Sequence, residues 1–333
     1  METDILFSAF CRKFLTFLVV LATARTESLC PNGCTCDPKF STTTLTVNCQ
    51  RNAQVSREQL TGQLDSMLSS NLTYGRLRSL TIRNTPLTNV PRSVCQLTTL
   101  TELNLDSNQL TRLPDNCLSN LTALTSFSAS TNNITELQDG LFDGLSKLQT
   151  LGLALNCISS IGLRVFNSSA MLSSLKSVDL YGNKIQTLEP WPLYLGLNGE
   201  SVQIELRHNS ISAFTNMMGW QARCGMEPVS VKVKLNHNHI KHISDFLHGW
   251  SINMTTFVCL TPHRLDAKSA VLEFADNPIE CDCVDFDMLK VLHQPYMHTT
   301  ALANTFCYGP VDLAGRKVLA VPLPELVLSL IHI

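Results

Sequence analysis

The sequence predicts an α/β repeat protein that stacks into a curved solenoid, with a parallel β-sheet on its concave face and a cysteine-rich cap at each end. Three observations lead to this fold class. One apolar pattern recurs eight times within residues 77–279, cysteines cluster on both sides of the repeats, and the N-terminus resembles a secretory signal. The chain has 333 residues and a formal net charge of −2. This balance provides no basic field that would attract nucleic acid.

Residues 1–24 have the features of a signal peptide. Arg12 and Lys13 precede an apolar run from Phe14 to Ala22, and Ala22-Thr23-Ala24 has the small-x-small form of a cleavage site. The apolar run is too short for a membrane span, which takes about 20 residues. We therefore expect cleavage after Ala24 and export from the cytosol.

The cysteine content and the sequons agree with export. Thirteen cysteines are many for a cytosolic protein, and in an oxidising compartment most of them should be paired. Asn-x-Ser/Thr sequons predict a glycosylated outer surface. The expected glycosylation sites are Asn71, Asn120, Asn133, Asn167 and Asn253.

The repeat has apolar residues at offsets 0, 3, 5, 10 and 13, and asparagine at offset 8. Copies that fit this pattern throughout begin at Leu100, Leu124, Leu148 and Leu175. An upstream copy begins at Leu77 and has Thr85 at the asparagine position. Three downstream copies centre on Asn209, Asn238 and Asn277.

The spacing within the repeat dictates its structure. The apolar residues at offsets 3 and 5 alternate with polar ones, which predicts a short strand with one inward face. Strands of successive repeats should form a parallel sheet with rungs about 4.8 Å apart. The asparagine should turn inward and bond to loop backbone groups that would otherwise be buried without partners. No repeat can bury its apolar edge alone, so stability should come from stacking.

The repeats loosen towards the C-terminus. Successive asparagines are 24 residues apart in the middle of the chain, and the last two are 39 apart. The extra residues include 217–220 and 246–268, which we expect in loops. Functional insertion and simple drift remain equal interpretations of these loops.

Cysteine motifs flank the repeats. Cys30-Pro-x-x-Cys34-x-Cys36 with Cys49 stands before them, and Asn277-Pro-x-x-Cys281-x-Cys283 with Cys307 stands after them. These motifs resemble the caps of extracellular leucine-rich-repeat proteins, a family that includes Toll-like receptors, Slit and the lamprey variable lymphocyte receptors. The resemblance extends from residue 30 to about residue 326.

The resemblance implies a leucine-rich-repeat solenoid with disulfide-bonded end caps. Residues 25–76 would form the N-terminal cap and a first irregular rung, residues 77–279 about eight repeats, and residues 280–327 a truncated C-terminal cap. The family pattern pairs Cys30 with Cys36, Cys34 with Cys49, and Cys281 with Cys307. It also pairs Cys283 with a cysteine about twenty residues beyond Cys307, and here the sequence departs from it because none follows.

Residues 328–333 suggest a cause for this departure. Leu-Ser-Leu-Ile-His-Ile is what CTG TCT CTT ATA CAC ATC encodes, which looks like the end of a widely used transposase sequencing adapter. We expect that a truncated transcript was read into the adapter. The alternative is a natural short C-terminus, and the genomic sequence would distinguish the two.

Five cysteines lie outside the caps. Cys95 and Cys117 have nearly equal offsets in neighbouring repeats, so they either form a rung-to-rung disulfide or fill buried apolar positions. Cys224 and Cys259 fall in the loosened loops, where they either pair with each other or stay separate. Cys157 has no evident partner.

No motif for catalysis stands out. His208 and His237 share offset 7 in adjacent repeats, and His239 and His242 follow closely, so a metal site and solvated histidines are the two interpretations, the second being favoured. The sequence shows no nucleophile-base pair or phosphate-binding loop. We expect no enzyme activity, no cofactor and no metal.

A binding surface is easier to predict. Offsets 2, 4 and 6 alternate with the buried strand positions and should face outward on the concave side. Early rungs offer Arg83, Glu102, Asn104 and Asp106, and the middle rungs carry Ser126, Ser128, Ser130, Thr150, Gly152 and Ala154. Later rungs offer the predicted ligand-binding residues Asp179, Tyr181, Glu205, Arg207, Lys232 and Lys234. A solvated face without a partner is the alternative interpretation.

The sequence thus predicts an extracellular recognition or adhesion ectodomain that binds a protein or glycan on its concave face, as a fragment of a receptor. A secreted matrix or soluble binding protein without a signalling role is the alternative. An extracellular enzyme that uses the repeats as an adaptor would need a catalytic domain beyond residue 327.

Overall fold

The computed structural model describes residues 30–37, 43–49, 56–69, 77–114, 117–166, 174–189, 201–215, 231–245, 271–281 and 304–322. Several expectations fall outside these residues. They are the signal peptide, most residues of the two long loops, the six C-terminal residues, the sequons at Asn71, Asn167 and Asn253, and Cys224, Cys259 and Cys283.

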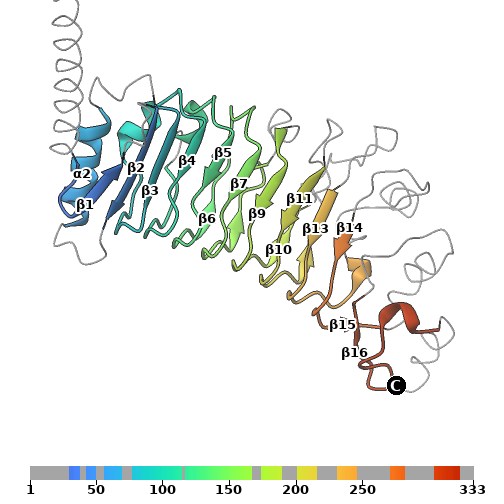
Figure 1. Ribbon diagram of the computed structural model, residues 1–333. Helices are drawn as coiled ribbons and strands as arrows, with labels where there is room; N and C mark the ends of the chain where they lie inside the picture. The colour runs from blue at the N-terminus through green and yellow to red at the C-terminus, as the bar shows by residue number, and fades with distance from the viewer. Residues whose placement is uncertain are drawn as a thin grey trace, which may run out of the picture.

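One ten-stranded sheet runs through the described chain, and its strands stand side by side in Figure 1. Its order is β1-β2-β3-β4-β5-β7-β9-β11-β13-β14, and every pair is parallel except β1 with β2. The strands are β1 (Cys34–Asp37), β2 (Thr44–Cys49), β3 (Ser79–Arg83), β4 (Glu102–Asn104), β5 (Ser126–Ser128), β7 (Thr150–Gly152), β9 (Ser177–Asp179), β11 (Val202–Glu205), β13 (Val231–Lys234) and β14 (Val271–Glu273).

Each of the eight predicted repeats contributes one strand, from β3 to β14, so the expected parallel-sheet solenoid is confirmed. The apolar positions of the described repeats line a single core. Phe127, Phe142 and Phe166 pack in sequence through its middle, with ring centroids 6.4 Å and 6.2 Å apart. Contacts between neighbouring repeats therefore provide the stability that no repeat has alone.

Shorter elements lie outside the main sheet. β6 (Glu136–Leu137) pairs with β8 (Ser160–Ile161), and β10 (Thr187–Leu188) pairs with β12 (Ala213–Phe214). The 3-10 helices η1 (Arg92–Gln96) and η2 (Leu118–Asn120) belong to the first two repeats. β15 (Ile279–Glu280), β16 (Cys307–Gly309) and η6 (Val318–Ala320) lie at the C-terminal end.

Helix α2 (Arg57–Leu68) was not predicted individually and lies beside the first strands in Figure 1. Its start is fixed by a capping box in which Ser56 accepts the N–H of Gln59 and the Gln59 side chain accepts the N–H of Ser56. Asp65 then accepts two hydrogen bonds from Ser93 of η1, at 2.9 and 2.7 Å. The helix thus packs beside η1 of the first repeat, and its residues Leu60, Leu64, Met67 and Leu68 join the core.

The asparagines at offset 8 form a buried ladder. Asn156 shows the pattern, because its Nδ2 donates to the carbonyls of Ala129 and Leu153 and its Oδ1 accepts the N–H of Ile134, all within 3.1 Å. Each side chain thus bonds its own repeat and the preceding one. The members are Asn108, Asn132, Asn156, Asn183, Asn209, Asn238 and Asn277, each at most 7% exposed.

Candidate binding face

The outward side of the ten-stranded sheet, at offsets 2, 4 and 6, is called the sheet face here. Register aligns its residues in rows along the stack. The row at offset 4 runs through Asn104, Ser128, Gly152, Asp179, Glu205, Lys234 and Glu273. The described side chains of this face are mostly exposed or half-buried. Ala154 is the exception: it was expected to face outward, but it is only 8% exposed. Its methyl group is too short to reach past its neighbours.

The predicted ligand-binding residues lie on the adjacent strands β9, β11 and β13 or two residues beyond their ends, and are called the later patch: Asp179, Tyr181, Glu205, Arg207, Lys232 and Lys234. Glu205 is its electrostatic centre. Both oxygens of this carboxylate are bonded by Arg207, at 2.6 and 2.9 Å, and Lys234 Nζ lies 3.0 Å away. Lys232 Nζ instead lies 2.6 Å from Glu273.

These contacts shift the pKa values of the two acidic groups of the later patch, Glu205 and Asp179, in opposite directions. Burial alone would raise the pKa of Glu205, but hydrogen bonds from Arg207 and Lys234 outweigh it and lower that pKa below its usual value. The bond to Glu205 also raises the pKa of Arg207. Burial raises the pKa of Asp179, and the nearby Glu205 charge adds to the rise, although the Tyr181 N–H opposes it.

An aromatic column borders the later patch. The His208 and His237 rings stack with centroids 4.3 Å apart and planes 12° from parallel, and Tyr181 meets His208 edge-on at 5.0 Å. The predicted proximity of the two histidines is therefore confirmed. His237 Nε2 lies 3.2 Å from Asp276, a partner that the sequence analysis missed. The sequence could have revealed Asp276, because it occupies offset 7 of the next repeat, the same offset as His237.

The column follows a repeated backbone feature. The offset-7 residues have φ between 54° and 65°, in the left-handed region. They are Asn84, Ser107, Thr131, Leu155, Gly182, His208, His237 and Asp276. The turn at the end of each strand therefore places all these residues along one edge of the sheet.

The early rungs differ in chemistry. Asp106 accepts hydrogen bonds from the Ser128 hydroxyl and the Ser130 N–H, at 2.6 and 2.7 Å, and from Asn104, at 2.9 Å. Arg83 and Glu102 are exposed. The early rungs are thus linked to the middle rungs by hydrogen bonds.

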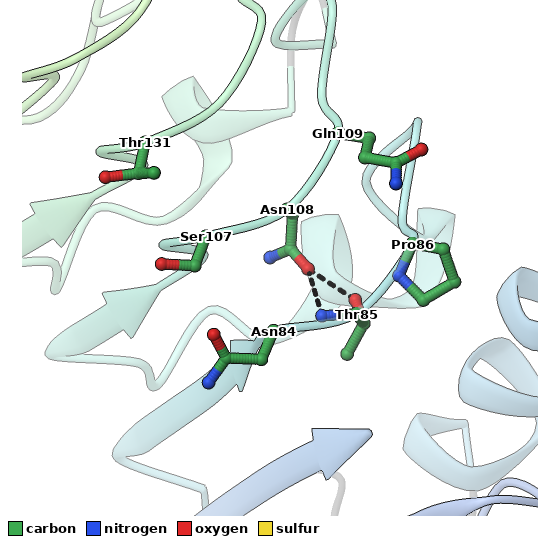
Figure 2. Close-up of a pocket in the computed structure, with 7 residues that line it drawn as sticks. All are labelled: Asn84, Thr85, Pro86, Ser107, Asn108, Gln109 and Thr131. Carbon is green, nitrogen blue, oxygen red and sulfur yellow. Dashed lines mark hydrogen bonds between the residues drawn. The ribbon is translucent and has the colours of Figure 1, made fainter. Parts of the chain in front are cut away.

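A hollow of about 330 Å³ lies at the edge of the early rungs (Figure 2). One lining residue is the buried Thr85, which replaces asparagine in the first repeat, and Figure 2 shows the N–H and hydroxyl of Thr85 bonded to Asn108 Oδ1. Its lining residues are Asn84, Thr85, Pro86, Ser107, Asn108, Gln109 and Thr131. The sequence analysis did not predict the hollow. The sequence feature that marks this place is Thr85, which stands where the other repeats have asparagine.

Disulfides lie near both ends of the described chain. Cys30 is bonded to Cys36, and Cys281 to Cys307, as the cap resemblance implied. Cys34 is disulfide-bonded and lies opposite Cys49 in the β1–β2 register.

Between the caps, Cys95 is bonded to Cys117, which decides between the two interpretations of this pair. Cys157 is not disulfide-bonded. The sequon residues Asn120 and Asn133 are exposed, where a glycan could be attached.

The stretches of chain whose structure is described contain no helix with the length and apolarity needed to cross a bilayer. In the same stretches, no group of three or more His, Cys, Asp or Glu side chains is arranged to hold a metal ion.

Comparisons with known proteins address the fold. A family model described as leucine rich repeat matches residues 75–134 and 125–185. Human 5T4 (Wnt-activated inhibitory factor 1, Trophoblast glycoprotein) is 17% identical with a TM-score of 0.54, and the match covers 90% of this chain and 98% of that chain. The comparison with curated protein sequences found no match.

Two further solved structures are similar over part of their length. The leucine-rich repeat domain of APL1B is 22% identical with a TM-score of 0.44, and the match covers 62% of this chain and 49% of that domain. Toll in the Drosophila Toll–Spatzle complex is 19% identical with a TM-score of 0.46, with 76% and 38% covered. The chain therefore spans half or less of these two proteins.

The family match and the likeness to 5T4 agree with the stacked parallel strands of the structure. Residues 75–185 match the leucine rich repeat family model, and the described chain folds as a leucine-rich-repeat solenoid with disulfides near both ends.

Proposed function

We propose that this protein is an extracellular recognition module, part of a receptor or adhesion protein, that binds another protein through the later patch of its sheet face. The observation that carries the proposal is the alignment of Tyr181 and Arg207 with charged neighbours on one outward sheet surface. Arg207 also lies over the Tyr181 ring, 5.8 Å from its centroid. Tyrosine and arginine are enriched among the residues that dominate protein–protein binding energy.

The disulfides support the extracellular part of the proposal. Cys30–Cys36, Cys95–Cys117 and Cys281–Cys307 all lie within one chain, and such bonds persist in oxidising compartments. The exposed sequon residues Asn120 and Asn133 fit the same location.

A rigid sheet also suits recognition. The bonds of Arg207 and Lys234 to Glu205 hold three long side chains in fixed positions before a partner arrives. Preorganised side chains lose less conformational entropy on binding, so more of the contact energy remains as affinity. The patch therefore fits a specific protein surface better than it fits a loosely held ligand.

An engineered glycan tests the proposal. Ser128→Asn changes residues 128–130 to Asn-Ala-Ser, a sequon on β5, which lies two rungs, or about 10 Å, from β9. Multimers of the secreted protein would be screened against an array of extracellular proteins, and each hit would be measured again with the variant. We expect the glycan to abolish binding by steric exclusion.

Gln96→Asn provides the matched control. It changes residues 96–98 to Asn-Leu-Thr on η1, away from the sheet face, and imitates the natural sequon Asn120-Leu-Thr of the next repeat. Glycan occupancy of both variants would be checked by the mass lost on enzymatic deglycosylation. A hit that survives the glycan at position 128 but is lost with the glycan at position 96 contradicts the proposal.

A further inference from the structure

The acidic groups of the sheet face differ in how they are neutralised. Glu205 is bonded to Arg207 and Lys234, and Glu273 to Lys232. Asp179 has no ion-pair partner among the described residues, and Arg207 and Lys234 act on it only at longer range. The one hydrogen bond of its side chain among the described residues is from the Tyr181 N–H to Oδ1, at 3.0 Å. Asp179 is therefore the carboxylate of the later patch with spare capacity for a cation.

The register leaves one side of Asp179 open. In the offset-4 row its neighbours are Glu205 on β11 and Gly152 on β7. Glu205 is a like charge, whereas Gly152 has no side chain to cover the carboxylate. An incoming side chain can reach Asp179 from the β7 side without displacing a large residue.

The surrounding sheet face has one sign of charge. From β4 to β9, the residues at offsets 2, 4 and 6 include the carboxylates Glu102, Asp106 and Asp179 but no lysine or arginine. Apart from the exposed Arg83 on β3, the cations at these offsets among the described residues, Arg207, Lys232 and Lys234, lie from β11 onwards and are paired with Glu205 or Glu273. This half of the face therefore favours approach of a positive group.

Building on the proposed function, we infer that the protein partner presents a lysine or arginine side chain that enters over Gly152 and pairs with Asp179 beside Tyr181. The second oxygen of Asp179 has no hydrogen-bond partner among the described residues, so a guanidinium can bond to it. The contact places a basic side chain of the partner at the boundary between the acidic rungs and the paired charges of the later patch. It also fixes the direction in which the partner lies along the stack.

A small cationic probe tests this inference. The protein has five tyrosines, so selective ¹⁵N-tyrosine labelling gives few amide signals, and Tyr181→Phe identifies the one of interest. That amide bonds to Asp179 and therefore reports on its carboxylate. N-acetyl-arginine amide should shift the Tyr181 signal saturably at low salt and less at high salt. N-acetyl-citrulline amide, its uncharged analogue, should not.

Matched variants complete the test. Asp179→Asn should abolish the response, and Glu136→Gln, which removes an exposed carboxylate on β6 outside the sheet face, should preserve it. Asp179→Ser provides a second removal of the charge, and thermal unfolding of each variant checks that it is folded. An equal response to both probes, or a response that persists without the Asp179 carboxylate, overturns the inference.

The same variants separate this inference from the proposed function. A protein partner that is excluded by the glycan at position 128 but binds Asp179→Asn with unchanged affinity overturns the basic contact and leaves recognition by the sheet face standing. A partner that ignores the glycan contradicts the proposed function itself.

Discussion

At the scale of the residue, the asparagine ladder is the feature most sensitive to substitution. Asn156 bonds to backbone groups of Ala129, Leu153 and Ile134. Asn156→Ala leaves these buried groups without partners, so we expect a loss of about 3 kcal/mol in the free energy of unfolding, measured by urea denaturation. Asn104→Ala on the sheet face should cost less than about 1 kcal/mol, because its partner Asp106 keeps other bonds. Equal losses would contradict a structural role for the ladder.

A second residue-scale prediction concerns pH. Burial, reinforced by the charge of Asp139, raises the pKa of Glu189 from 4.5 to about 6. Because the pKa is higher in the folded state, Glu189 reduces stability as pH rises from about 4.5 through about 6. Glu189→Gln should therefore stabilise the protein at pH 7.5, by at most about 1 kcal/mol after allowance for solvent screening. At pH 4 the variant and the original should have equal unfolding midpoints, and a gain that persists there would exclude this cause.

At the scale of the element, the strands could be predicted but the connections could not. Strand positions follow from alternation around residues such as Leu103 and Leu151, because each has one inward face in every repeat. Helix α2 has a capping box in its sequence, but it occurs once and the repeat pattern does not reveal it. The ion pairs of Glu205 depend on which of several nearby cations reaches it, and alternation alone cannot decide this.

The position at offset 17 or 18 of each repeat is another feature whose contacts the repeat pattern could not predict. Phe142 and Phe166 fill it in later repeats, whereas Cys95 and Cys117 fill it in the first two and are bonded. Replacing both cysteines by serine opens a loop of 22 residues and should lower the free energy of unfolding by about 3 kcal/mol. Cys157→Ser, at a cysteine without a disulfide, is the control for removal of a thiol and should change stability little. A double variant as stable as this control would show that the bond contributes nothing.

At the scale of the whole molecule, the solenoid should respond locally to damage, because each repeat contacts only its neighbours. Phe142 is fully buried and contacts the rings of Phe127 and Phe166. Phe142→Ala should cost about 3 to 5 kcal/mol through the cavity it creates. Hydrogen exchange should then accelerate in β5, β7 and β9, while β2 and β3 keep their protection. Leu163→Ala, at a leucine 61% exposed near the same repeat, should leave every strand unchanged. Equal acceleration in all strands would instead mean that the stack unfolds as one cooperative unit. A partner bound at the later patch would then stabilise the caps as much as the repeats that it contacts.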